Sequence, residues 1–132
     1  MSAATEAKMR EALAAHLQLK FESARCELGT AEKVDGWVRL TERCWLILEV
    51  EEGQQHPSTN VLKLWPVLEK RPELTVILAH VFFATSRAAR NSRGELATWL
   101  GSHMESSLHG RFRYRRLIAN CGGHAFSDSR VS

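Results

Sequence analysis

The chain is 132 residues long, a length that suits one domain with one hydrophobic core and is short for two. Hydrophobic residues make up 44% of it and charged residues 25%, an ordinary globular composition that argues against a disordered chain. The net charge of +3 permits a polyanionic partner without requiring one. We therefore predict one domain over residues 1–132, with short flexible ends at about 1–5 and 127–132.

The cysteines, Cys26, Cys44 and Cys121, are odd in number and include no CxxC pair. This arrangement fits neither a disulfide framework nor a zinc knuckle, and it indicates reduced thiols in the cytoplasm. Charged residues precede any apolar run at the N-terminus, and no stretch reaches the roughly 18 apolar residues of a membrane span. We expect a cytoplasmic protein that has no membrane partner.

The first predicted element is an amphipathic helix from Thr5 to about Leu28. Apolar residues recur along it at spacings of four and three, as on a helix buried along one face. Gly29 follows directly and is placed to end the helix. The residues of the stripe are Met9, Leu13, Leu17, Phe21 and Ala24.

Two strands joined by a tight turn are predicted next, in the segments EKVDGWVRL and RCWLILEVE. Both are rich in β-branched and aromatic residues, and the short polar segment between them is typical of a hairpin. With residues 41–43 as the loop, Asp35 faces Glu49 on the neighbouring strand. Alternation puts Glu49 and Glu51 on the same face of the second strand, about 7 Å apart.

The rest of the chain predicts a helix, a buried strand, a second helix and a last strand. Pro57 suits the first turn of the helix, and Pro66 should kink that helix or end it early. The nearly uninterrupted apolar run LTVILAHVFF predicts a central strand covered on both faces, and RFRYRRLI predicts an edge strand. The order α-β-β-α-β-α-β predicts an α/β fold, with a mixed β-sheet and flanking helices in a single domain.

Large aromatic residues fall on the apolar pattern of these elements, so we expect them in the core rather than as platforms for stacked bases. His80 lies inside the buried strand and is expected to be buried and hydrogen-bonded. The tryptophans in question are Trp37, Trp45, Trp65 and Trp99.

Acidic residues gather where the second strand ends. Asp35 and Glu49 would carry like charges opposite each other, which destabilises a sheet unless a cation lies nearby. Converging carboxylate oxygens are also the ligands that Mg²⁺ requires. We interpret Asp35, Glu49 and Glu51 as ligands of Mg²⁺ or Mn²⁺. The alternative is that Glu49 pairs with Arg39 or Lys33 while Glu51 lies in solvent.

The order of the elements and the placement of these acids resemble the PD-(D/E)xK nuclease superfamily, which has a restriction-endonuclease-like core. The resemblance covers roughly residues 5–83, where VDG supplies Asp35 and LEVE supplies Glu49. It implies one or two magnesium ions beside the scissile phosphate and a lysine that positions or activates the attacking water. Glu51 stands at the usual lysine position, and Lys63 on the following helix is the best substitute.

Polar and basic residues near the acids are candidate substrate contacts. Gln55, His56 and Asn60 follow the second strand, where the alternative is a polar loop. Arginine binds phosphate through two hydrogen bonds and without reading sequence, although charges at a sheet edge also block aggregation. Glu22 on the first helix is an additional candidate acid, or else a solvated charge. The candidate arginines are Arg87, Arg90, Arg93, Arg113 and Arg115.

Three functions follow as hypotheses. The first is a small metal-dependent nuclease that hydrolyses DNA phosphodiester bonds, with Asp35, Glu49, Glu51 and Lys63 as its catalytic residues. The second is a catalytically silent nuclease-fold domain that binds nucleic acid or protein. The third takes residues 92–117 as a helix-turn-helix DNA-binding regulator. A chain this short leaves both a homodimer and a subunit of a larger assembly open.

Overall fold

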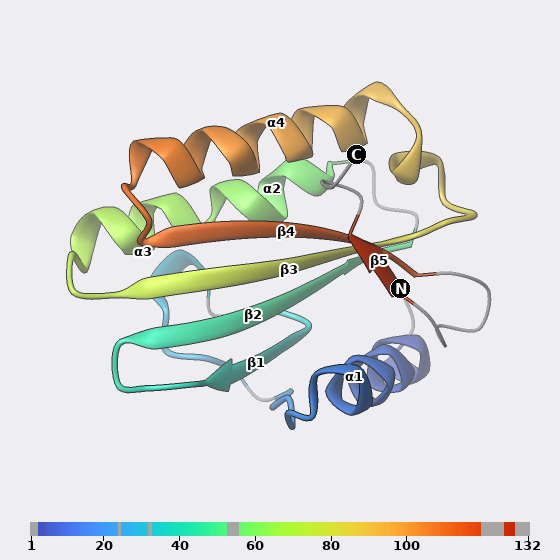
Figure 1. Cartoon of the computed structure of the whole chain (residues 1–132), viewed down its shortest axis with the longest axis horizontal. Coiled ribbons are helices and arrows are strands. Elements are labelled where there is room, and N and C mark those ends of the chain that lie inside the picture. Colours follow the sequence, from blue (N-terminus) through green and yellow to red (C-terminus); the bar gives the residue numbers. More distant parts are fainter. Residues whose placement is uncertain (1–2, 24, 32, 53–55, 120–125, 129–132) are drawn as a thin grey trace.

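The computed structural model describes residues 3–23, 25–31, 33–52, 56–119 and 126–128. It has an α/β fold built on a mixed sheet with helices on both faces (Figure 1), which confirms the predicted class. The strands pair in sequence order. They are β1 (Gly36–Arg39), β2 (Cys44–Glu51), β3 (Thr75–Phe83), β4 (Phe112–Ala119) and β5 (Phe126–Asp128).

The helices divide between the two faces of the sheet. Helix α1 lies on one face, whereas α2, α3 and α4 form a layer on the other (Figure 1). Short 3-10 turns, η1 (Gly29–Ala31) and η2 (Arg87–Ala89), precede β1 and α4. The helices are α1 (Ala3–Leu17), α2 (Pro57–Leu62), α3 (Leu64–Lys70) and α4 (Ser92–Ser107).

The direction of the strands brings two chain segments to one edge. β1 and β2 form an antiparallel hairpin, whereas β2, β3 and β4 are parallel neighbours. The carboxyl ends of β2 and β3 therefore lie at the same edge of the sheet. The acids at the end of β2 share this edge with η2 and the start of α4, which follow β3 (Figure 1).

The register of the hairpin agrees with the sequence prediction. Gly36 pairs with Leu48, so Asp35, one position before β1, faces Glu49. The backbone N–H of Asp35 donates to the carbonyl of Leu48 at 3.1 Å, which continues the ladder beyond the strand. A tight turn that fixes the loop length also fixes this register.

Alternation along β2 sorts its side chains between two apolar clusters. Trp45 and Ile47 pack in the cluster under α2, α3 and α4, whereas Leu48 and Val50 pack in the cluster that includes Leu13 of α1. β3 contributes buried residues to both clusters, so its prediction as a central covered strand is confirmed. Glu49 and Glu51 consequently face the helical layer that also carries Lys63.

The first helix is shorter than predicted, because α1 ends at Leu17 rather than near Leu28. Gln18 adopts a left-handed φ of 57°, and the N–H of Leu19 closes the last turn on the carbonyl of Ala14 at 2.9 Å. This is a left-handed helix end formed without glycine. Phe21 therefore continues the apolar stripe from an extended segment, which the spacing of apolar residues could not reveal.

The helix after β2 breaks where a proline was expected to disturb it. Pro57 is the first residue of α2, as predicted, and Lys63 separates α2 from α3. Pro66 has no N–H to offer the carbonyl of Leu62, so one α-helical hydrogen bond is lost at this point. The break places the side chain of Lys63 beside the end of β2.

The structure differs from the sequence prediction in three further ways, at the two ends of the chain and in its last third. β4 is not an edge strand along its whole length, because β5 pairs with residues 117–119. β5 also gives a paired conformation to Ser127 and Asp128, and α1 begins at Ala3, so parts of both expected flexible ends belong to regular elements. Gly101 lies inside α4, so residues 92–117 contain one helix and a strand rather than two helices.

None of the helices in the described residues is long and apolar enough to cross a membrane.

Candidate functional site

The structure brings Asp35 and Glu49 together at the start of β1 and the end of β2. The Val50 N–H donates to Oδ2 of Asp35 at 2.7 Å, and the Asp35 N–H donates to Oε1 of Glu49 at 3.2 Å. Each carboxylate thus accepts a backbone hydrogen bond from the strand of the other. The two acidic side chains are held close to each other by the hairpin itself.

Burial dominates the electrostatics of Glu49, which is 3% exposed. Loss of solvation and repulsion by Asp35 raise the pKa of this carboxyl from 4.5 to about 8, although the ammonium of Lys63 opposes the change. Lys63 Nζ lies 3.2 Å from Glu49 Oε1, so one cation is already present. A single lysine does not offset the burial of Glu49 beside a second carboxylate.

Lys63 reaches this site from the break between α2 and α3. Its ammonium donates to the Lys33 carbonyl at 2.8 Å and to Asn60 Oδ1 at 3.2 Å, in addition to its contact with Glu49. Asn60 precedes Lys63 by one helical turn, so the two side chains lie on the same helical face. The structure therefore brings both residues to the acids, as expected for a lysine supplied by the neighbouring helix.

Glu51 belongs to a second, fully buried network. Its Oε1 accepts from Asn60 Nδ2 at 2.6 Å and lies 2.8 Å from His80 Nε2, and His80 Nδ1 lies 2.8 Å from the Tyr114 hydroxyl. The side chains of Glu51 and His80 are both 0% exposed. Oε2 of Glu51 is buried and has no hydrogen-bond partner among the described residues.

Burial favours the neutral form of His80 in this network. Complete burial lowers the pKa of the imidazole below 6.5, and the neighbouring carboxylate of Glu51 offsets this only in part. With Glu51 as an acceptor, Nε2 of the neutral ring carries the proton and Nδ1 accepts from the Tyr114 hydroxyl. The expectation of a buried, hydrogen-bonded histidine is confirmed.

The partners of His80 were not identified from the sequence. The sequence predicts Glu51 as a metal ligand and gives no link between it, His80 and Tyr114. A signal was present, because Glu51, His80 and Tyr114 each occupy the helix-facing side of neighbouring strands. The strand order and register were needed to bring them together.

The arrangement of the acids meets part of what a divalent cation requires of its ligands. Within the described residues, no three His, Cys, Asp or Glu side chains are grouped so that they could hold one ion together. The Asp35 and Glu49 pair alone fits Mg²⁺, which is commonly held by one or two carboxylates, water and substrate phosphate. Glu51, two residues after Glu49 on β2, has a buried Oε2 with no hydrogen-bond partner among the described residues, and this oxygen is a further candidate ligand.

Three further residues were predicted for the site: Gln55, His56 and Glu22. His56 is exposed directly before α2, and Gln55 falls outside the described residues. Glu22 is exposed and lies beyond the end of α1, where its backbone pairs with Trp37. Glu22 is thus not on the first helix, which ends five residues before it.

The candidate arginines divide between two places. Arg87, Arg90 and Arg93 are exposed on η2 and the start of α4, at the sheet edge where β2 ends. Arg113 is exposed on the α1 side of the sheet, opposite the face that carries the acids. Arg115 contacts Glu105 of α4 at 3.2 Å. The first three alone share the edge of the acids.

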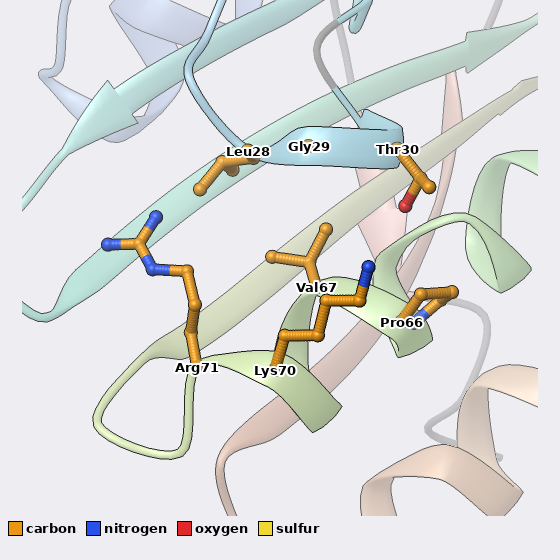
Figure 2. Close-up of a pocket in the computed structure, with 7 residues that line it drawn as sticks. All are labelled: Leu28, Gly29, Thr30, Pro66, Val67, Lys70 and Arg71. Atoms are coloured by element: carbon orange, nitrogen blue, oxygen red, sulfur yellow. The ribbon is translucent and has the colours of Figure 1, made fainter.

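A small cavity of about 180 Å³ lies between η1 and α3. Figure 2 shows Val67 and Lys70 of α3 directed toward the segment from Leu28 to Thr30. The Thr30 hydroxyl donates to the carbonyl of Lys63 at 2.6 Å, so the cavity borders the backbone of that residue. Neither the acids nor His80 line it, and it is separate from the site described above.

Comparison of the chain with protein-family models, curated proteins and solved structures gave no match. The arrangement of side chains is therefore the basis for any statement about function.

Proposed function

We propose that the protein is a small metal-dependent nuclease that hydrolyses DNA phosphodiester bonds. The observation that carries the proposal is the hairpin pair: Asp35 and Glu49 are held together at one strand end, and Lys63 Nζ lies 3.2 Å from Glu49. Two acids at the end of a hairpin, with a lysine from the break between α2 and α3 beside them, support the site that the PD-(D/E)xK resemblance implies. The resemblance itself remains part of the proposal.

The charge balance supports a divalent cation at this pair. A carboxyl whose pKa is raised to about 8 is mostly protonated at neutral pH, and a neutral acid is a poor ligand. A cation between Asp35 and Glu49 would favour both ionised forms and remove their repulsion. When bound, Mg²⁺ would supply Lewis-acid stabilisation of charge on the phosphate.

The neighbouring side chains have separable roles in this proposal. Lys63, which carries a fixed positive charge, would stabilise the negative charge that develops on the phosphate. Glu51 would accept a proton from water or contribute an oxygen ligand through Oε2. Asn60 holds both residues, since it donates to Glu51 and accepts from Lys63.

The exposed basic edge supports nucleic acid as the substrate. Arg87, Arg90 and Arg93 follow the carboxyl end of β3, and β2, its parallel neighbour, ends at the same edge of the sheet. Arginine contacts with backbone phosphate give affinity without sequence specificity. We therefore propose DNA cleavage with little sequence preference.

Cleavage assays test the proposal directly. Plasmid and single-stranded DNA are incubated with the protein and either Mg²⁺ or Mn²⁺, and the wild type is compared with Glu49→Ala. Glu42→Ala, an exposed acid in the hairpin turn, is the matched control. We expect cleavage by the wild type and the control and none by Glu49→Ala. Equal cleavage by Glu49→Ala contradicts the assignment.

A second candidate function, a catalytically silent binding domain, is favoured by one observation. Glu51 Oε1 accepts a hydrogen bond from Asn60 and contacts the His80 imidazole. The Lys63 ammonium contacts the Lys33 carbonyl, Asn60 and Glu49. These contacts within the protein can serve the fold alone. Calorimetry separates the two functions: Mg²⁺ binding that is lost in Asp35→Ala favours the nuclease, and no binding at millimolar Mg²⁺ favours the silent domain.

A further inference from the structure

An exposed hydrophobic patch lies on the outer side of the helical layer. Leu62, Leu96 and Trp99 are 50%, 53% and 60% exposed, and all three belong to α2 or α4. The rings of Trp99 and His103 stack at 5.1 Å, and the rings of His103 and Trp65 lie 6.0 Å apart. We call these five residues the helix patch. Trp99, expected in the core, is instead exposed, whereas Trp65 is partly buried and packs against the core.

The helix patch spans three helices, α2, α3 and α4. The α2 and α3 segment and α4 each connect the carboxyl end of one parallel strand to the start of the next, so they run in the same direction (Figure 1). Trp65 meets His103, and Leu62 and Trp99 each lie about one helical turn before that contact on their own helices. The expectation that Trp99 is a core residue is therefore wrong.

The outer side of α4 lacks the charges that a solvent-facing helix normally carries. Beyond Glu95, its exposed positions hold no Lys, Arg, Asp or Glu. Aromatic enrichment with depletion of charge is the composition of an interface core. The exposed residues are Leu96, Trp99, Ser102, His103, Ser106 and Ser107.

We propose that the helix patch docks on a second copy of this chain, with the two α4 helices antiparallel about a two-fold axis at Trp99. A two-fold axis brings each residue against the one at the same distance on the other side. Glu95 and His103 lie four positions before and after Trp99, so the acid of each copy meets the imidazole of the other. The serines beside them allow the helices to approach closely.

The surroundings favour a protein over a nucleic acid strand. A stacking platform for bases combines aromatic rings with a positive groove. The Trp65 indole N–H instead donates to the carboxylate of Glu69 at 3.0 Å, and Arg93 is the only basic Lys or Arg of α4. The proposal does not depend on nuclease activity.

Light scattering coupled to gel filtration, over a dilution series, tests the proposal. We expect the wild type to have twice the mass of one chain, with dissociation on dilution in the micromolar range or below. Leu96→Glu should be monomeric. Leu40→Glu is the matched control, since Leu40 is 40% exposed in the hairpin and lies outside the helix patch. Circular dichroism verifies that each variant is folded.

A charge exchange tests the two-fold arrangement itself. Glu95→Lys should weaken the dimer at least tenfold, and adding His103→Glu should restore it by pairing lysine with glutamate across the axis. A wild type that is monomeric throughout the series overturns the proposal, as does a Leu96→Glu variant that remains dimeric. If the wild type is monomeric and Trp99→Ala binds single-stranded DNA more weakly, the helix patch serves nucleic acid instead.

Discussion

The carboxylate of Glu51 and the imidazole of His80 lie 2.8 Å apart, and both side chains are completely buried. Glu51 occupies β2 and His80 occupies β3, so the contact joins two central strands inside the helical layer. His80 also binds the Tyr114 hydroxyl of β4. One polar chain therefore crosses three strands of the sheet.

Replacing His80 should destabilise the protein, because Glu51 would lose a donor that buried water cannot easily replace. We expect His80→Phe to lower the free energy of unfolding by about 2–4 kcal/mol. Urea denaturation measures this, and His56→Phe at an exposed position is the control. A Glu51→Leu and His80→Phe double variant that is more stable than the His80 variant would support the pairing, whereas additive losses would argue against it.

The raised pKa of Glu49 predicts that stability depends on pH. Between pH 4.5 and about 8 the folded protein keeps a proton on Glu49 that the unfolded chain releases, so stability falls as pH rises. His80 acts oppositely, but only below its ordinary pKa of 6.5. The Glu49 effect is therefore isolated between pH 6.5 and about 8.

Urea denaturation across that window measures the slope. We expect the wild type to lose stability with rising pH and Glu49→Gln to lose less. Mg²⁺ should flatten the slope of the wild type if it binds the ionised Glu49. A wild type and a Glu49→Gln variant with the same slope would mean that Glu49 titrates near 4.5 in the folded protein.

Gly101 allows α4 to lie against Tyr114. A Cβ at position 101 would meet the Tyr114 ring at 2.3 Å, closer than real Cβ contacts allow. We expect Gly101→Ala to destabilise the protein by about 1–3 kcal/mol, although alanine favours a helix. Thermal unfolding measures the loss, and Ser102→Ala at the next, exposed position is the control. Unchanged stability in Gly101→Ala would mean that the helix can shift at no cost.

Removal of the basic edge should weaken DNA binding and its dependence on salt. We expect replacement of Arg87, Arg90 and Arg93 by Gln to reduce the slope of log affinity against log salt by about 0.9 for each lost contact on duplex DNA. Arg113→Gln should change the slope less, because Arg113 lies on the opposite face of the sheet. Fluorescence anisotropy measures both, and equal slopes in all proteins would exclude this edge as the DNA-binding surface.

Local pattern and turn length determined much of the fold from the sequence alone. Alternation in WLILEVE assigned Glu49 and Glu51 to one face, and a short loop fixed Asp35 opposite Glu49. Both inferences held because strand periodicity and hairpin register depend on residues close together in the chain. The proline at position 66 acted in the same local way.

Only the tertiary structure decided where the long-range partners lie. Glu51, His80 and Tyr114 are separated by 29 and 34 residues, and their contact depends on the order of strands in the sheet. The tertiary structure also decided the end of α1 at Leu17 and the exposure of Trp99. The spacing of apolar residues indicates which side chains can be buried, but it does not indicate which element covers them. The sequence by itself determined which side chains share a face, and the packing of distant elements determined which of them meet.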